Sequence, residues 1–256
     1  MLNKIVGVLI NLPDPWPPVK PKAMSWWRCA AVMSLGLAIF GSILWNGGNS
    51  AKAAPTIQYS QGFEIDNDWG SPGPTFDDPT RVASGTNGIT SRTGGFHAEA
   101  VGGNFTRFGG YNSVFPANGY TTSIDIFLNT SGGYANDTRF DWSSAINDTT
   151  GTHRRDFIFH GGFYSDGGPY GSGDRFVFTV SNNAPGWPRD PSRGPVVVAS
   201  SGWYTLKHTF LPGAGGRLVV KMELIDAANN PIGTWSLSDP TDIIGSTVGG
   251  NRYGWL

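Results

Sequence analysis

Apolar and polar residues alternate most strongly between Arg154 and Asn183, and this pattern restricts the fold more than any other feature of the chain. Side chains of a β-strand point alternately to its two faces, so Phe157 and Phe159 share one face and His160 lies on the other. A second run, which begins at position 175, alternates in the same way. The Gly-, Ser- and Asp-rich loop between the runs is too long for a two-residue turn. We therefore expect two antiparallel strands, each with one apolar face, joined by a long loop of the kind that often carries binding function.

The rest of the chain has the composition of an all-β protein. Its 256 residues include 37 Gly and 18 Pro, and short aromatic and β-branched runs alternate with turn residues. Asp239–Ile244 is the segment expected to form a helical turn, with Asp239 as its cap and Pro240 at the first position. Ten or more short strands without an internal repeat predict a two-sheet antiparallel jelly-roll sandwich. Besides the two runs above, the expected strands are Ile57–Ile65, Arg81–Ser84, Gly88–Thr90, Phe96–Val101, Tyr120–Asn129, Arg139–Trp142, Val196–Ala199, Trp203–Phe210, Arg217–Asp226 and Gly233–Leu237.

The first 53 residues resemble a leader rather than part of the fold. From Met24, a short segment containing Arg28 precedes an apolar run, Cys29–Leu44, and a polar stretch that ends at Ala53. This order is typical of a secretory signal peptide over 24–53, with cleavage after Ala53. An uncleaved membrane anchor is the alternative, although the 16 residues of the apolar run are fewer than the roughly 20 that span a bilayer.

This leader divides the chain into three parts. Residues 1–23 match no targeting pattern, and we interpret them as a mis-assigned start or an N-terminal extension. Residues 54–256 are long enough for one β-sandwich domain with its own core. We expect this domain to be secreted, with no stable membrane insertion after the leader is cleaved.

Charge and cysteine content limit what the domain binds. Five of the 18 Lys and Arg residues and one of the 19 acidic residues precede Ala54, so Ala54–Leu256 has a formal net charge of −5. The sequence shows no basic patch, so we expect no nucleic-acid partner. The single cysteine, Cys29, lies in the leader, so the domain depends on core burial, with a bound ion as a further source of stability.

Several segments together resemble the concanavalin A-like lectin/glucanase superfamily. They are Gly62-Phe63-Glu64 followed by Trp69, Trp203–Leu206, Leu218–Leu224 and Gly233–Trp235. The resemblance implies a jelly-roll sandwich over most of 54–256. One departure concerns the end of the chain, because Tyr253–Leu256 reads as the start of a strand where such sandwiches close with a terminal strand. We therefore keep open a domain that lacks its closing strand.

The resemblance also implies a structural calcium ion. Jelly-roll carbohydrate-binding modules commonly open with a Phe-Glu pair whose carboxylate helps to hold calcium, which takes six to eight oxygen ligands. Here the ligands would be Glu64, Asp66 and Asp68, with Asp77 or Asp78 from across the loop. The alternative is that these acids are solvated or cap turns, as most acids in polar loops do.

An enzymatic interpretation uses a second set of residues. Alginate-lyase-like members of the superfamily place Arg, Gln, His and Tyr on one sheet, where Arg neutralises a uronate and His or Tyr moves the proton. The resemblance assigns these roles to Arg139, His160 and Tyr164. The companion Gln-x-His and Lys-Ala-Gly segments are absent, and we favour the interpretation of His160 as a half-buried strand histidine hydrogen-bonded to a neighbour. The sequence shows no Ser/His/Asp order, zinc spacing or phosphate loop.

Aromatic residues in or beside loops give a third set, because flat rings stack on sugar rings and nearby Asp side chains bind hydroxyls. Trp187, between Gly186 and Pro188, is the best candidate for an exposed stacking residue, whereas Trp142 is equally well explained as core. Trp203 and Trp235 lie in expected strands and are assigned to the core. The candidate ligand-binding residues are Trp187, Trp142, Tyr164, Tyr170, Asp141 and Asp166.

These observations favour a secreted, non-catalytic, lectin-like β-sandwich domain that binds a glycan or polysaccharide. A polysaccharide lyase or glycoside hydrolase of the same fold is the first alternative. A structural cell-surface or adhesion domain is the second.

Overall fold

The computed structural model describes residues 5–6, 8–9, 57–65, 69, 78–100, 103–108, 111–184 and 186–256. The chain separates into two units, Met1–Leu12 with Ile57–Leu256, and Pro13–Thr56. The second unit lies outside the described residues, and with it the expected signal peptide and its cleavage position. No helix in the described part of the chain is long and apolar enough to cross a bilayer.

The described residues form β-strands and three short 3-10 turns, without an α-helix, so the prediction of an all-β fold is confirmed. Eight of the ten runs named above lie within one or two residues of an observed strand, or inside one. The strands are β1 (Ile5–Val6), β2 (Val8–Leu9), β3 (Thr80–Ala83), β4 (Phe96–Ala100), β5 (Phe105–Thr106), β6 (Tyr120–Leu128), β7 (Thr138–Asn147), β8 (His153–Tyr164), β9 (Arg175–Asn182), β10 (Val196–Val198), β11 (Gly202–Pro212), β12 (Arg217–Ile225), β13 (Pro231–Ile243) and β14 (Asn251–Trp255), and the turns are η1 (Thr86–Gly88), η2 (Pro191–Arg193) and η3 (Ala214–Gly216).

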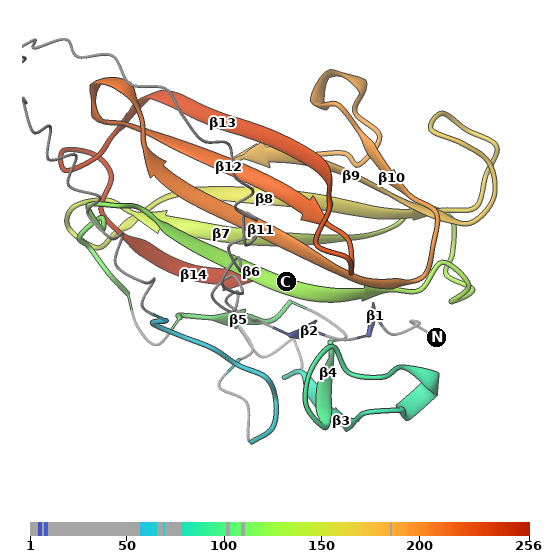
Figure 1. The fold of residues 1–256 in the computed structure, drawn as a ribbon. Coiled ribbons are helices and arrows are strands. Elements are labelled where there is room, and N and C mark those ends of the chain that lie inside the picture. The colour runs from blue at the N-terminus through green and yellow to red at the C-terminus, as the bar shows by residue number, and fades with distance from the viewer. Residues whose placement is uncertain are drawn as a thin grey trace, which may run out of the picture. The chain divides into compact units, whose positions relative to one another are not determined.

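The strands form three antiparallel sheets (Figure 1). The largest has the order β10-β9-β8-β7-β14-β5, the second has the order β13-β12-β11-β6-β2, and a small sheet has the order β1-β4-β3. The two runs that dominate the sequence pattern are β8 and β9, which pair with Phe159 opposite Val180. The predicted hairpin is therefore confirmed, and residues 165–174 form its long loop.

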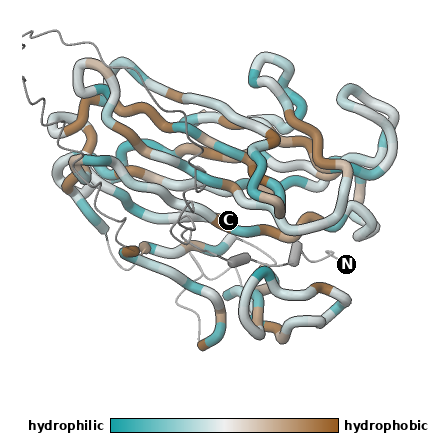
Figure 2. The backbone as a smooth tube through the Cα atoms, viewed as in Figure 1, coloured by the Kyte–Doolittle hydropathy of each residue, from teal (hydrophilic) through white to brown (hydrophobic). Residues whose placement is uncertain are grey.

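The two larger sheets pack face to face around one apolar core. Phe157 of β8 meets Phe210 of β11 with ring centroids 5.6 Å apart, and Phe159 lies edge-on to His208 at 5.0 Å. Figure 2 shows the apolar residues gathered along the strands, whereas the long loops are mostly pale or hydrophilic. Core residues of the six-stranded sheet include Trp142, Ile146, Phe157, Phe159, Phe163, Phe176 and Phe178, and those of the five-stranded sheet include Ile124, Ile126, Leu206, Phe210, Val220, Met222 and Leu224.

A polar bridge crosses this core. His208 on β11 is fully buried, and its Nε2–H donates to the carbonyl oxygen of Phe157 on β8 at 3.0 Å. Beside it, the Thr122 hydroxyl of β6 donates to Ser144 Oγ of β7 at 3.0 Å. Burial lowers the pKa of His208 from 6.5 to about 3, so the ring is neutral in the folded protein at ordinary pH.

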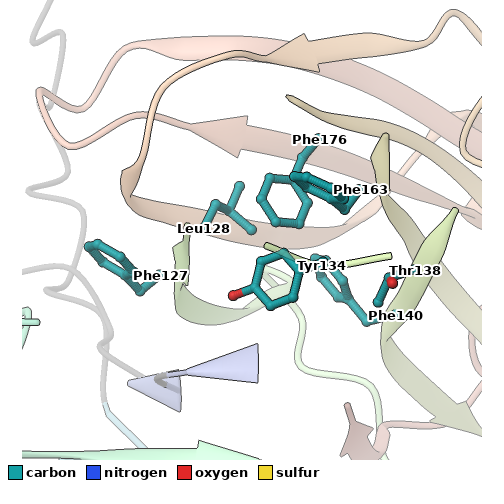
Figure 3. Close-up of a pocket in the computed structure, with 7 residues that line it drawn as sticks. All are labelled: Phe127, Leu128, Tyr134, Thr138, Phe140, Phe163 and Phe176. Carbon is teal, nitrogen blue, oxygen red and sulfur yellow. The ribbon is translucent and has the colours of Figure 1, made fainter. Parts of the chain in front are cut away.

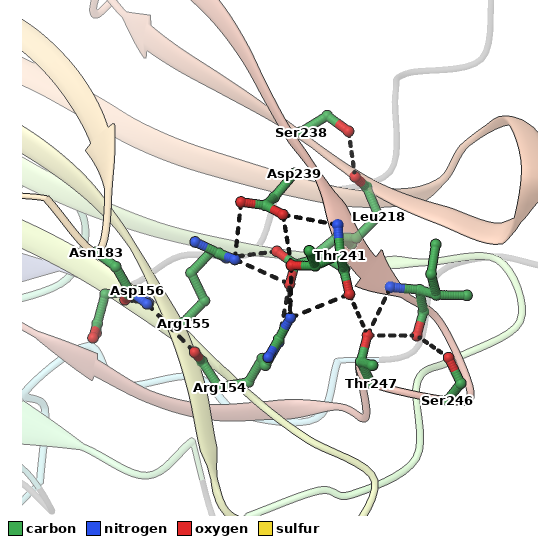
Figure 4. Close-up of polar contacts among 12 residues, drawn as sticks. Arg154, Arg155, Asp156, Asn183, Leu218, Ser238, Asp239, Thr241, Ser246 and Thr247 are labelled. Carbon is green, nitrogen blue, oxygen red and sulfur yellow. Dashed lines mark hydrogen bonds and ion pairs between the residues drawn. The ribbon is translucent and has the colours of Figure 1, made fainter.

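Charged residues connect β8 to the end of β13 (Figure 4). The Asp242 carboxylate is buried and accepts hydrogen bonds from Arg154 Nε at 3.0 Å and Arg155 Nε at 2.6 Å. Arg155 also pairs with Asp239 at 3.1 Å. These contacts connect the two larger sheets at one edge and stabilise the fold.

The expected helical turn at Asp239–Ile244 is wrong, because this segment continues β13 as far as Ile243. Asp239 does accept a hydrogen bond from the Thr241 N–H at 2.8 Å, which is the local chemistry of a cap. However, the ion pairs with Arg154 and Arg155 and the pairing of Ile243 with Arg217 of β12 hold the segment extended.

The expected strands Ile57–Ile65 and Gly88–Thr90 are also wrong. In the first segment only Gln61 forms a bridge, because its side chain accepts a hydrogen bond from the Phe63 N–H at 2.7 Å and Phe63 has a φ of +60°. The Phe63 ring is nevertheless fully buried in the core. The second segment overlaps the 3-10 turn η1.

The final strand, β14, lies inside the six-stranded sheet. Trp255 pairs with Ser143 of β7 on one side and with Phe105 of β5 on the other. Gly254 faces the core, where an added Cβ would lie 2.3 Å from the Trp142 ring, so only glycine fits. The segment that reads as the start of a strand therefore is a strand, paired on both sides.

Candidate ligand-binding face

Four predicted site residues lie on the outer face of the six-stranded sheet, the face turned away from the core: Arg139, Asp141, His160 and Tyr164. Strand register arranges this face in rows. One row runs from Trp255 through Ser143 and Ile158 to Ser181, and the neighbouring row contains Asp141, His160 and Thr179. Residues directly opposite each other on neighbouring strands have side chains close enough to interact.

The loop between β8 and β9 is held by one arginine. Arg175, at the start of β9, is buried, and its guanidinium donates to the carbonyl oxygens of Tyr170 at 2.9 Å, Asp166 at 2.9 Å and Gly173 at 2.7 Å. Tyr170 itself is half-buried with a φ of +73°. The hairpin loop is therefore ordered by contacts within itself.

Asp166 is occupied by arginines rather than free for a ligand. Its carboxylate accepts hydrogen bonds from both terminal nitrogens of Arg189, with Nη1 at 2.8 Å, and from Arg175 Nη2 at 3.2 Å. The hydrogen bonds from Arg189 hold the pKa of Asp166 well below its usual range. Asp166 thus fastens the hairpin loop to the next loop, 183–195.

Arg189 also covers Tyr164. Its guanidinium lies 3.4 Å from the centre of the Tyr164 ring, and Tyr164 is buried. Burial, with a further contribution from the Asp137 carboxylate, raises the pKa of Tyr164 to about 12. The Tyr164 ring is therefore unavailable for stacking on a sugar, and its hydroxyl is protonated at ordinary pH.

The loop that carries Trp187 is packed directly onto the sheet. Gly186 lies against the imidazole of His160, where an added Cβ would come within 1.9 Å of the ring. The Thr179 hydroxyl donates to the carbonyl oxygen of Trp187 at 3.0 Å, so the backbone is fixed at that residue. The Trp187 side chain remains 41% exposed, as the sequence predicted.

Asp141, His160 and Ser181 form one hydrogen-bonded chain across β7, β8 and β9, in which Asp141 and His160 were predicted site residues and Ser181 was not. His160 Nδ1–H donates to Asp141 Oδ1 at 2.8 Å, and His160 Nε2 lies 2.7 Å from Ser181 Oγ. The Ser181 hydroxyl also lies 2.8 Å from the carbonyl oxygen of Ala184, and its single proton goes either to that oxygen or to Nε2. His160 and Ser181 are buried, whereas Asp141 is 54% exposed.

This hydrogen-bonded chain has the order of groups found in Ser-His-Asp hydrolases, but the Ser181 hydroxyl is buried beside the carbonyl oxygen of Ala184. In the described conformation it joins the exposed carboxylate of Asp141 to the loop that carries Trp187. The period-two pattern of β8 and β9 contained part of the signal, because it puts His160, Thr179 and Ser181 on one face.

The other predicted residues are placed differently. Trp142 is fully buried and stacks on Trp69 with centroids 6.0 Å apart, so the suggestion that it binds a ligand on the surface is wrong. The Arg139 guanidinium pairs with its neighbour Asp137 at 2.6 Å and is exposed. Of the lyase residues, Arg139 is therefore accessible, whereas His160 and Tyr164 are buried.

The proposed calcium ligands are described only in part. Asp66, Asp68 and Asp77 lie outside the described residues. Glu64 Oε1 accepts hydrogen bonds from the N–H groups of Gly95 and Phe96, at 2.9 and 3.1 Å. Among the residues that the structure describes, no group of three His, Cys, Asp or Glu side chains is arranged to hold a metal ion.

An apolar pocket opens elsewhere, at one end of the two large sheets (Figure 3). It is lined by Phe127, Leu128, Tyr134, Thr138, Phe140, Phe163 and Phe176. It has room for about one water molecule, which is far too small for a sugar ring. We therefore place the candidate site on the open outer face.

Trp255 is an exposed aromatic that sequence reasoning did not select. It is 39% exposed, and strand alternation directs it to the outer face, since Gly254 faces the core. Its strand pairs with strands far away in sequence, so no local pattern indicated that Trp255 is exposed on this face. No family model, curated protein or solved structure gives a significant match to this chain.

Proposed function

We propose that the domain is a secreted, non-catalytic, lectin-like module that binds a glycan on the outer face between Trp187 and Trp255. The observation that carries the proposal is the exposed Trp187 ring, held on a loop whose backbone is anchored to the sheet. A loop whose backbone is already fixed loses little further entropy when a ligand stacks on its aromatic ring. Jelly-roll connectivity of the concanavalin A type is part of the same proposal.

Asp141 supplies the polar component of this site. Its Oδ1 is bound by His160, and because the side chain is half exposed, its Oδ2 is available to accept a hydrogen bond from a sugar hydroxyl. Ile158, in the row beside it, is partly exposed and adds apolar surface. Flat aromatic faces with a few well-placed polar groups are the usual composition of a sugar-binding surface.

The non-catalytic part of the proposal is supported by burial. Of the groups with acid–base or nucleophilic chemistry at the site, His160, Tyr164 and Ser181 are buried, and the exposed Asp141 carboxylate is hydrogen-bonded to His160. A calcium ion held by Glu64, Asp66 and Asp68 stays a prediction, and comparing thermal unfolding with calcium and with chelator checks it.

A glycan array followed by titration calorimetry tests the proposal. Trp187→Ala and Trp255→Ala should each weaken binding of the selected glycan about tenfold, or ~1.4 kcal/mol. Leu211→Ala, which truncates an equally exposed side chain on β11, is the matched control and should bind like the wild type. A folded protein that binds no glycan, or Trp variants that bind normally, would reject the proposal.

A further inference from the structure

Next to Trp255, the surface carries alternating arginine and aromatic side chains, which we call the arginine–tyrosine row. The Arg107 guanidinium lies 5.3 Å from the centre of the Tyr111 ring, and the Arg252 guanidinium lies 4.5 Å from the same ring. Arg252 also lies 5.7 Å from the Tyr253 ring, which stacks on His153 at 6.1 Å. Tyr111 is 45% exposed between its two arginines.

A β-bulge builds this row. Asn251 pairs with Ile146 and Tyr253 pairs with Ala145, so Arg252 is the extra residue on β14. A bulge locally breaks the alternation of side chains and redirects one of them. As a result, the Arg252 guanidinium contacts the ring of its own neighbour Tyr253 instead of pointing to the opposite face.

The two arginines differ from most others on this sheet because they lack acidic partners. Six other arginines each pair with an aspartate within 4.0 Å: Arg139, Arg154, Arg155, Arg175, Arg189 and Arg193. Within the described ranges, neither Arg107 nor Arg252 has a carboxylate at that distance. Arg252 Nη1 donates to Asn147 Oδ1 at 3.1 Å and to the Gly151 carbonyl at 3.0 Å, while its buried Nε has no partner in the part of the chain that is described.

The row is continuous with the proposed glycan site. Phe105, whose ring lies 5.7 Å from Arg107, pairs directly with Trp255, and Tyr253 lies two residues before Trp255 on the same strand. A chain of sugars that stacks on Trp255 therefore reaches both arginines. The positive charge is local, because Ala54–Leu256 carries a net charge of −5 and would repel polyanions in general.

We infer that the arginine–tyrosine row is the subsite for the acidic group of an anionic glycan, a carboxylate or a sulfate. The exposed Arg107 guanidinium can bind such a group through two parallel hydrogen bonds, Arg252 adds positive charge beside it, and the Tyr111 face packs against the sugar ring that carries the group. This inference rests on the proposed function, since it names the class of glycan which the outer face binds.

The test compares an oligouronate, a sulfated oligosaccharide and a neutral oligosaccharide of equal length on the full chain. Arg107→Gln should weaken binding of an anionic oligosaccharide at least tenfold, leave neutral binding unchanged and reduce the salt dependence. Arg107→Lys, which keeps the charge but loses the fork, should recover only part of the affinity. Arg217→Gln removes the same charge from the exposed start of β12 and should have no effect.

The outcomes separate the two proposals. Glycan binding that depends on Trp187 but not on Arg107 overturns the anionic subsite and leaves the lectin-like function intact. Equal losses in Arg107→Gln and Arg217→Gln also overturn the subsite, because they indicate general charge attraction. A folded protein that binds no glycan overturns both proposals. The same holds for a protein that binds only single-stranded nucleic acid or anionic vesicles.

Discussion

Replacing His208 with glutamine should make the free energy of unfolding depend less on pH below about pH 7. His208 is enclosed between the two sheets, and its Nε2–H donates to the Phe157 carbonyl at 3.0 Å. Its pKa is about 3 in the folded protein and about 6.5 in the unfolded chain. Below pH 6.5 the unfolded chain therefore binds a proton that the folded protein does not bind, and stability falls as the pH falls.

The size of this effect follows from the two pKa values. Each pH unit between them removes about 1.4 kcal/mol, so the wild type should lose about 2 kcal/mol from this residue alone between pH 7.5 and pH 5. The loss would approach about 4 to 5 kcal/mol near pH 3. Above pH 7 the imidazole is neutral in both states and makes no pH-dependent contribution.

Urea unfolding at several pH values measures this directly. His208→Gln should be less stable than the wild type at pH 7.5, by about 1 to 3 kcal/mol, because packing and the hydrogen bond to Phe157 change. Its further loss down to pH 5 should be about 2 kcal/mol smaller than that of the wild type. If the variant does not fold, the wild-type imidazole resonance of His208 should show no protonation down to pH 4.5. Equal pH slopes, or protonation of His208 in the folded protein near pH 6, would refute the reasoning.

Two further predictions concern buried polar groups. Asp242→Asn should lower the unfolding free energy by about 2 to 4 kcal/mol, because it leaves the guanidinium groups of Arg154 and Arg155 without their shared carboxylate. Asp239→Asn, in a more exposed pair, should cost less than about 1 kcal/mol, and equal losses in urea unfolding would contradict the argument. Ser181 should not react with a fluorophosphonate probe, because its hydroxyl is buried beside Ala184. Labelling detected by mass spectrometry and abolished in Ser181→Ala would instead show a working nucleophile.

The sequence predicted the parts of the fold that depend on local periodicity. Alternation identified β8, β9, β6 and β12, because in each strand one face enters a continuous apolar core. It failed at 57–65, where the Gln61 side chain binds the Phe63 N–H and turns the chain although Phe63 still reaches the core. The prediction of a helical turn at Asp239–Ile244 also failed. The local capping chemistry was present there, but distant arginines determined the conformation.

The candidate site was harder to predict, because the exposure of its side chains depends on how the sheets and the covering loops pack. Trp142 and Trp187 are both flanked by small or polar residues, yet one points into the core and the other lies on a covering loop. Tyr164 and Asp166 were selected as ligand-binding residues, but Arg189 stacks on the Tyr164 ring and binds the Asp166 carboxylate. Nothing local indicates that an arginine more than 20 residues further along the chain will make both contacts.

The loops over β8 and β9 also determine where a ligand can bind. Ala184 and residues 186–189 lie against the outer side of these strands, where Thr179, Ser181 and Tyr164 are buried. The open part of the face is therefore displaced toward β7 and β14, where Asp141 and Trp255 are exposed. Because β14 also carries the bulge at Arg252, the residue proposed to stack on a sugar and one of the residues proposed to bind its acidic group come from one five-residue strand. Moving that strand by one register position would therefore eliminate both contacts together.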